Sequence, residues 1–172
     1  MTVCPWAIRP TAQATTGFGV KKYTSYEDDV TIPLVERSAF NFILIRYAEV
    51  LLTYAEAQNE ASGPDQSVYD AINQLRRRPD INMPEVPKGL TKDQMREVIR
   101  RERRIELTFE GLYYSDILRW KTAEKENNGM MHNYDGIEVV KRSFNPKRDY
   151  LWPIPYNQTV LNPNLEQNPN WD

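Results

Sequence analysis

Apolar residues recur at helical spacing in three stretches of the chain. Between residues 40 and 61 they cover most of the helix circumference up to Ala55, which predicts a helix packed on more than one side. The Ser-Gly-Pro at 62–64 is expected to end this helix. A second helix is predicted at about 67–77, with Asp65 or Ser67 as its cap. Its single apolar stripe consists of Val68, Ala71, Ile72 and Leu75.

The third stretch begins at a sequence pattern for a capping box. Thr91 is followed three residues later by Gln94, so the two residues can satisfy each other's backbone N–H groups at a helix start. The helix is expected to run to about Glu110, with Gly111 as a break and a further helical piece at 112–121. Its predicted apolar stripe consists of Met95, Val98, Ile99, Ile105 and Phe109.

The remaining segments lack helical periodicity. Residues 122–149 are polar and predict a loop with a turn at Asp135-Gly136, in which 137–140 pair in a small hairpin. Prolines throughout 150–172 exclude a long helix and predict an extended strap lying across the helices. The anchors expected for this strap are Trp152, Leu161, Leu165 and Trp171.

These patterns predict a mainly α fold of helical hairpins similar to tetratricopeptide units, with long irregular loops and an extended proline-rich C-terminal strap. Prolines and glycines punctuate residues 1–39 without clear periodicity, so this part is expected to be an irregular loop segment. The helical region is expected to cover 40–172.

Composition excludes several classes of function. The chain has 172 residues, a net charge of −2 and a single cysteine, Cys4, which rules out an intramolecular disulfide framework. The charge argues against a nucleic-acid partner, and glutamates interleave the basic run Arg96–Arg104. The most apolar stretch, Phe40–Ala57, contains three charged residues and does not predict a membrane span.

Two carboxylates interrupt the apolar face of the third helix. Glu102 and Glu106 lie one turn apart, and an unpaired buried charge costs several kcal/mol. A glycosidase acid and nucleophile usually project from different elements across a cleft, so ion pairing is the favoured interpretation. Asp116 and Arg119 are interpreted in the same way. The expected structural ion-pair network consists of Arg46, Glu102, Arg103, Glu106, Asp116 and Arg119.

No other residue pattern indicates catalysis, a metal or a cofactor. His132 is the only histidine and is expected on the surface, and no phosphate-binding glycine loop or paired-cysteine motif is present. Among the aromatic residues, Trp6 and Tyr26 lie in the irregular opening segment and are the candidates for a carbohydrate-binding platform. The aromatic residues expected to pack in the core are Tyr47, Tyr54, Tyr69, Tyr113 and Trp120.

Three stretches in one order resemble the C-terminal portion of the SusD/RagB family of outer-membrane glycan-binding lipoproteins. They are RYAEVLLTYAEAQNEA from Arg46, ERRIELTFEGLYYSDILRW ending at Trp120, and YLWPIPYNQTVLNPNLEQNPNW from Tyr150. The resemblance covers residues 18 to 172. Asn170 stands where the family usually has glycine, and asparagine tolerates the positive φ of such a turn.

The resemblance implies a non-enzymatic protein of Bacteroidota that binds oligosaccharides such as starch-like glycans for nutrient uptake and polysaccharide utilization. Its expected partner is a TonB-dependent, SusC-like transporter, and its expected place is the outer face of the outer membrane. The family's lipid anchor is expected to be absent from this chain, because the residues before Cys4 lack a basic and an apolar region. In a chain that lacks neighbouring helices, the apolar helix at 40–57 is expected to expose an apolar or self-association surface.

Two alternatives remain open at this point. One is a helical-repeat domain that binds protein and has no role in sugar binding. The other is a glycoside hydrolase, which predicts that Glu102→Gln abolishes turnover.

Overall fold

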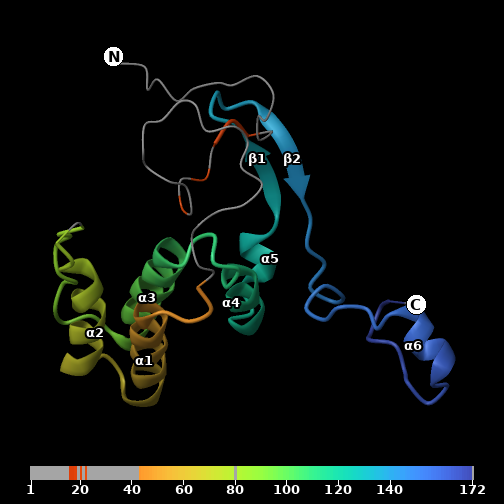
Figure 1. The fold of residues 1–172 in the computed structure, drawn as a ribbon, viewed down its shortest axis with the longest axis horizontal. Coiled ribbons are helices and arrows are strands. Elements are labelled where there is room, and N and C mark those ends of the chain that lie inside the picture. The colour runs from red at the N-terminus through yellow and green to blue at the C-terminus, as the bar shows by residue number, and fades with distance from the viewer. Residues whose placement is uncertain (1–15, 19, 21, 23–42, 80, 172) are drawn as a thin grey trace. The chain divides into compact units, whose positions relative to one another are not determined.

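In the computed structural model of the chain, the longest helices are α1 (Tyr47–Ser62), α2 (Gln66–Arg76) and α3 (Lys92–Glu106) (Figure 1). The structure describes residues 16–18, 20, 22, 43–79 and 81–171. It divides the chain into two compact units, one of residues 29–113 and one of residues 1–28 with 114–172. The predicted mainly α fold is confirmed. The predicted boundary between residues 39 and 40 lies outside the described residues and stays a prediction.

α1 and α2 form the predicted helical hairpin. The Tyr54 hydroxyl donates to Ser67 Oγ at 2.8 Å and Gln58 Nε2 donates to Asp65 Oδ2 at 2.7 Å, so the two helices run antiparallel from a tight turn. Asp65 is the cap of α2, because its Oδ1 accepts the backbone N–H groups of the first turn. All four residues of the predicted α2 stripe are buried: Val68, Ala71, Ile72 and Leu75.

The start of α1 differs from the prediction. The helix begins at Tyr47 and not at residue 40, and Arg46 precedes it in extended conformation with φ −134° and ψ 159°. No Ser, Thr, Asp or Asn caps this end, and the Arg46 side chain is instead committed to hydrogen bonds with the end of α3. Before it, Ile43, Leu44 and Ile45 are not helical and are exposed.

α3 begins at the predicted capping box, in which Thr91 N–H donates to Gln94 Oε1 at 2.9 Å. It packs against α1 through Met95, Ile99 and Arg103, which lie four residues apart on one face. The predicted stripe is wrong at its C-terminal end, because Ile105 and Phe109 are 62% and 63% exposed.

The geometry of the helix explains this error. Arg103 lies one turn after Ile99 and continues the buried face, whereas Ile105 is rotated away from that face. The helix also ends at Glu106 and not at Glu110, and Phe109 has a φ of 63° in the following turn. Leu107, which the pattern did not single out, is buried there.

Two apolar clusters hold the three helices together. The larger cluster consists of Ala55, Val68, Tyr69, Ala71, Ile72, Val86, Met95 and Ile99. The smaller one consists of Ala48, Leu52, Leu75 and Leu107, so it lies where α1 begins and where α2 and α3 end. The buried face of α1 thus contributes to both clusters.

The other unit contains most of α4 (Tyr113–Arg119), α5 (Ala123–Glu126) and a two-stranded hairpin. β1 (Gly129–His132) pairs antiparallel with β2 (Glu138–Arg142), and the register shifts between Met131 and His132. Asn133 Oδ1 shapes the turn by accepting the N–H groups of Asp135 and Ile137. The predicted helical piece after Gly111 and the predicted hairpin are confirmed, whereas α5 falls in a segment predicted to be a loop.

The C-terminal segment folds back on itself through side-chain amides. Gln167 binds the backbone of Ile154 twice, accepting its N–H at 2.8 Å and donating to its C=O at 2.9 Å. The loop closed in this way contains the short helix α6 (Tyr156–Leu161), which the proline pattern did not predict. Asn170 has a φ of 63°, so it adopts the turn conformation expected of it.

The apolar side chains of this segment differ from the expectation. Trp152 and Leu161 are 70% and 77% exposed, so they do not act as buried anchors. Trp171 is half-buried, and its indole N–H donates to the Leu151 carbonyl at 2.9 Å.

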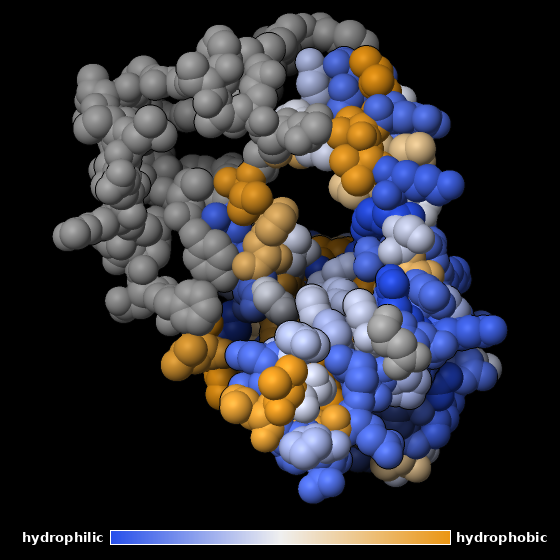
Figure 2. Space-filling view, turned by 90° about the vertical axis from the view of Figure 1, so that its right-hand side faces the viewer, coloured by the Kyte–Doolittle hydropathy of each residue, from blue (hydrophilic) through white to orange (hydrophobic). Residues whose placement is uncertain are grey.

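The predicted packing role of the aromatic residues is only partly correct. Tyr69 is buried, and Tyr113 and Trp120 are half-buried. Tyr47 and Tyr54 are exposed, because they lie on the face of α1 that turns away from both clusters. Figure 2 shows a mainly hydrophilic face on which hydrophobic side chains gather in several separate patches.

In the part of the chain that the structure describes, no helix has the length and apolar character needed to cross a bilayer.

Candidate functional site

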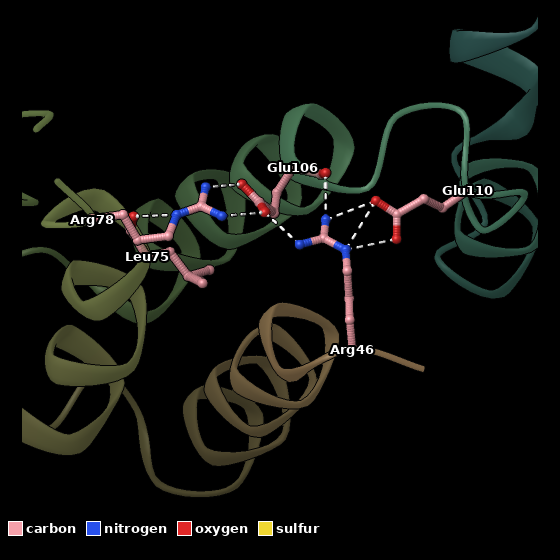
Figure 3. Close-up of polar contacts among 5 residues, drawn as sticks. All are labelled: Arg46, Leu75, Arg78, Glu106 and Glu110. Carbon is pink, nitrogen blue, oxygen red and sulfur yellow. Dashed lines mark hydrogen bonds and ion pairs between the residues drawn. The ribbon is translucent and has the colours of Figure 1, made fainter. Parts of the chain in front are cut away.

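Arg46 joins the start of α1 to the end of α3 (Figure 3). Its Nη1 donates to Glu106 Oε1 at 2.6 Å and its Nη2 donates to the Glu106 backbone carbonyl at 2.6 Å. Its Nε donates to both carboxylate oxygens of Glu110, at 3.0 and 2.8 Å. One guanidinium therefore holds two carboxylates and one of the backbone carbonyls that a helix end leaves without a partner inside the helix.

A second guanidinium reaches Glu106 from the end of α2. Arg78 Nη1 and Nη2 donate to the two carboxylate oxygens at 3.0 and 2.6 Å in a bidentate pair, and Arg78 Nε donates to the Leu75 carbonyl. Glu106 is 17% exposed, so a carboxylate with little access to water lies between two cations. The cluster formed by Arg46, Arg78, Glu106 and Glu110 thus ties together one end of each of the three helices, and it is called the helix-end cluster below.

The helix-end cluster holds Glu106 in its ionised form. Burial of the carboxyl group favours the neutral acid and is the largest single influence on it. Hydrogen bonds and charge from Arg46 and Arg78 together outweigh that influence, so the pKa of Glu106 lies below its ordinary value. An ionised carboxylate accepts hydrogen bonds but has no proton to donate near neutral pH.

The lowered pKa of Glu106 makes stability depend on pH. A depressed folded-state pKa contributes stability that is present above the unfolded-state pKa, about 4.3 for glutamate, and is lost as pH falls through the folded value. We therefore expect the difference in unfolding free energy between the wild type and Glu106→Gln to be constant from pH 7 to 5. Below pH 4 it should shrink.

Urea unfolding at a series of pH values measures this difference. Hydrogen bonds from Arg96 also lower the pKa of Glu60, so several groups contribute to the stability that the wild type loses in acid. Only the difference in unfolding free energy between the wild type and Glu106→Gln isolates the contribution of Glu106. A difference that stays constant down to pH 3 would show that the charge of Glu106 does not stabilise the fold.

The other two predicted members on α3 also have partners on neighbouring helices. Glu102 forms an ion pair with Arg76 at the end of α2. Arg103, 6% exposed, donates from Nη1 to Thr53 Oγ1 of α1 at 3.2 Å.

Asp116 and Arg119 pair with each other within α4. Asp116 is 4% exposed, and Arg119 Nε donates to its Oδ1 at 2.9 Å. The structure therefore brings Arg46 and Glu106 together as expected, while Asp116 and Arg119 belong to the other unit and form a separate pair. Whether these pairs serve the scaffold alone stays a prediction.

Sequence reasoning missed Arg78 and Glu110 as members of the helix-end cluster. Each of the three arginines at 76–78 pairs with a carboxylate: Arg76 with Glu102, Arg77 with Glu85 and Arg78 with Glu106. The sequence did contain a signal for this: two glutamates on the inner face of α3 require at least two cations from other helices.

The structure tests the predicted surface histidine but not the predicted ligand platform. Trp6 and Tyr26 lie outside the described residues, so their role stays a prediction. His132 is exposed as expected, although it lies on β1 and not in a loop. Among the described residues, no three His, Cys, Asp or Glu side chains gather in a group that could bind a metal ion.

Comparison with known proteins decides the family. The model of the SusD family matches residues 8–171. The chain belongs to the SusD family. Two curated relatives from Formosa agariphila are SusD-like protein P2, 37% identical over 136 residues, and SusD-like protein P38, 31% identical over 134 residues. The matched parts are 76% and 74% of this chain but only 26% and 24% of the relatives.

Solved structures of the SusD family have the same fold. A SusD-like carbohydrate-binding protein from Bacteroides fragilis is 38% identical with a TM-score of 0.66, over 72% of this chain and 28% of that protein. A SusD homolog from Bacteroides thetaiotaomicron is 32% identical with a TM-score of 0.61, over 80% of this chain and 30% of that protein. This SusD-family chain therefore spans about a quarter of the length of the curated relatives it matches.

Proposed function

We propose that the protein is a non-catalytic glycan-binding protein that captures oligosaccharides at the cell surface and delivers them to a TonB-dependent, SusC-like transporter. The observation that carries this proposal is membership of the SusD family along residues 8–171. It is supported by the 38% identical solved structure of a SusD-like carbohydrate-binding protein from Bacteroides fragilis. The proposed location is the extracellular face of the outer membrane, where the resemblance to the family implies attachment by a lipid anchor.

The chemistry of the carboxylates supports a role without catalysis. A glycosidase needs one carboxyl group that donates a proton and a second one that is free to attack or to activate water. Glu106 is held ionised between two guanidinium groups, and Glu102 is paired with Arg76. Neither arrangement leaves a proton donor beside an open nucleophile, and both favour a scaffold that holds helices in place.

Calorimetric titration of the protein against a panel of oligosaccharides tests the proposal. We expect saturable binding of at least one glycan and no shortening of that glycan on incubation. Trp6→Ala and Tyr26→Ala are expected to weaken binding at least tenfold, because an aromatic face that stacks on a sugar ring is lost. Tyr156→Ala removes an aromatic side chain that is 82% exposed on α6 and serves as the matched control.

The outcomes separate the candidate functions. Release of shorter sugars that Glu102→Gln abolishes would replace the proposal with a glycoside hydrolase. Failure of the folded protein to bind any glycan would favour the helical-repeat interaction domain, for which the exposed apolar face of α1 is the supporting observation. A pulldown then discriminates further, because the proposal expects a β-barrel transporter and the alternative expects a soluble protein.

A further inference from the structure

The turn between β1 and β2 binds a segment from the start of the chain. Tyr134 lies in this turn, and its backbone N–H donates to the Thr16 carbonyl at 3.0 Å. Its ring lies directly against Gly17, because a Cβ atom added there would overlap the ring atoms Cδ1 and Cε1. All three residues belong to the unit of residues 1–28 with 114–172. The contact of Tyr134 with Thr16 and Gly17 is called the Tyr134 contact below.

The turn that carries Tyr134 is fixed by its own hydrogen bonds. Asn133 Oδ1 accepts the N–H groups of Asp135 and Ile137 at 2.9 and 2.8 Å. The Asn133 N–H donates to the Ile137 carbonyl at 2.9 Å. The Tyr134 N–H has its partner outside the turn, on Thr16. A turn that is already ordered can hold Thr16 without a further loss of its own conformational entropy.

The Tyr134 contact requires glycine at position 17 for two reasons. The φ of Gly17 is 75°, in the left-handed region where a residue with a Cβ atom is strained. A Cβ atom would also overlap the Tyr134 ring. The ring remains 61% exposed, so burial in an apolar core does not explain why it lies against Gly17. The contact therefore depends on these particular residues.

We propose that Tyr134 is a positioning residue for glycan binding, because it fixes the chain between the two candidate ligand residues. Trp6 lies ten residues before Thr16 in the sequence, and Tyr26 lies nine residues after Gly17. Ten residues span at most about 36 Å, so holding Thr16 and Gly17 on the turn limits where either aromatic side chain can lie. This inference rests on the proposed function, with Trp6 and Tyr26 as its ligand residues.

The Tyr134 contact is expected to raise affinity through preorganisation. Binding loses less conformational entropy when the ligand residues are held near their bound positions before the ligand arrives. Without the contact, only a fraction of the molecules is competent to bind, and the apparent affinity falls by that fraction. Since Tyr134 acts on Gly17 and not on the sugar, the contact should change affinity without changing which sugars bind best.

Gly17→Ala tests the inference in the whole chain. Calorimetric titration uses the oligosaccharide panel, with maltoheptaose as its starch-like member. We expect the variant to bind at least about fivefold more weakly, with the order of affinities across the panel unchanged. Hydrogen exchange at the Tyr134 amide, followed by NMR, is expected to be at least about tenfold faster, because the acceptor on Thr16 is displaced.

Gly89→Ala is the matched control. Gly89 has a φ of 80°, and no described atom lies within 4 Å of the position that a Cβ atom would take there. The variant introduces the same backbone strain without a clash, so we expect less than about a twofold change in affinity and in exchange at Tyr134. Circular dichroism checks that both variants keep the wild-type helical content. Equal effects of Gly17→Ala and Gly89→Ala would overturn the inference.

Substitutions of Tyr134 separate positioning from direct contact with the sugar. Tyr134→Phe keeps the ring against Gly17 and is expected to bind like the wild type, whereas Tyr134→Ala is expected to bind more weakly. Because Gly17 and Tyr134 act through one contact, the double alanine variant should weaken binding by less than the product of the two single effects. A loss in Tyr134→Phe as large as in Tyr134→Ala would assign the hydroxyl group a direct contact with the sugar and would overturn the positioning role.

The outcomes also separate this inference from the proposed function. If the wild type binds no oligosaccharide of the panel, the proposed function fails and the positioning role fails with it. If the wild type binds and Gly17→Ala binds with the same affinity, the positioning role alone is wrong.

Discussion

Replacing Glu106 with glutamine is expected to lower the free energy of unfolding by about 2–4 kcal/mol at pH 7. The amide keeps the size of the side chain but loses its charge and one of its acceptor oxygens. The guanidinium groups of Arg46 and Arg78 then face a neutral amide that does not balance their positive charge, and the side chain at this position is only 17% exposed. Urea unfolding followed by circular dichroism measures the loss.

Glu85→Gln provides the control for that experiment. Glu85 pairs with Arg77, the neighbour of Arg78 in the chain, but both side chains are about half exposed. Solvent-exposed pairs contribute less than about 1 kcal/mol, so this variant should stay close to the wild type. Losses of the same size in Glu106→Gln and Glu85→Gln would mean that the helix-end cluster adds no more than an ordinary surface pair.

Replacing Ile72 with alanine is expected to lower the free energy of unfolding by about 3–4 kcal/mol. Ile72 is fully buried in the larger apolar cluster, with Ala55 of α1 and with Met95 and Ile99 of α3 in that cluster. The truncation removes buried methylene and methyl groups and leaves a cavity at the junction of three helices. The same urea titration measures the change.

Ile105→Ala makes the identical chemical change on an exposed part of α3. Because Ile105 is 62% exposed, no cavity forms, and the expected change is within about 0.5 kcal/mol of zero. A loss at Ile105 as large as that at Ile72 would contradict the burial assigned to these two positions. It would instead support the stripe expected from the sequence pattern.

Element boundaries that are marked by local signals could be predicted from the sequence. The capping box at Thr91 and Gln94, the cap at Asp65 and the Asp135-Gly136 turn each lie where the structure begins or reverses an element. These signals act over a few residues, because one side chain satisfies a nearby backbone N–H or shapes the turn. They can therefore be read without knowledge of the rest of the fold.

The errors lie where distant residues decide the structure. Nothing next to Arg46 marks the start of α1, because the side chain that defines this end binds Glu106 and Glu110. Likewise, apolar periodicity placed Ile105 on the inner face of α3, whereas the structure places Arg103 there, and the Arg103 guanidinium donates a hydrogen bond to Thr53 Oγ1 of α1.

The same limit applies to the candidate site. The need of Glu102 and Glu106 for cations was visible in the sequence, but the identity of the cations depends on how α2 ends beside α3. Arg46 pairs with Glu106, and Arg119 pairs with Asp116 as their spacing in the sequence indicates. The proposed ligand residues, Trp6 and Tyr26, remain predictions from the sequence.

The first residue of α1 is fixed by a contact across sixty positions of sequence, from Arg46 to Glu106. Contacts between residues far apart in the sequence form later on average than local ones, so we expect the hairpin of α1 and α2 to form before its N-terminal end is held by α3. The helix-end cluster is then expected to be among the last contacts to form, because it needs all three helices in place.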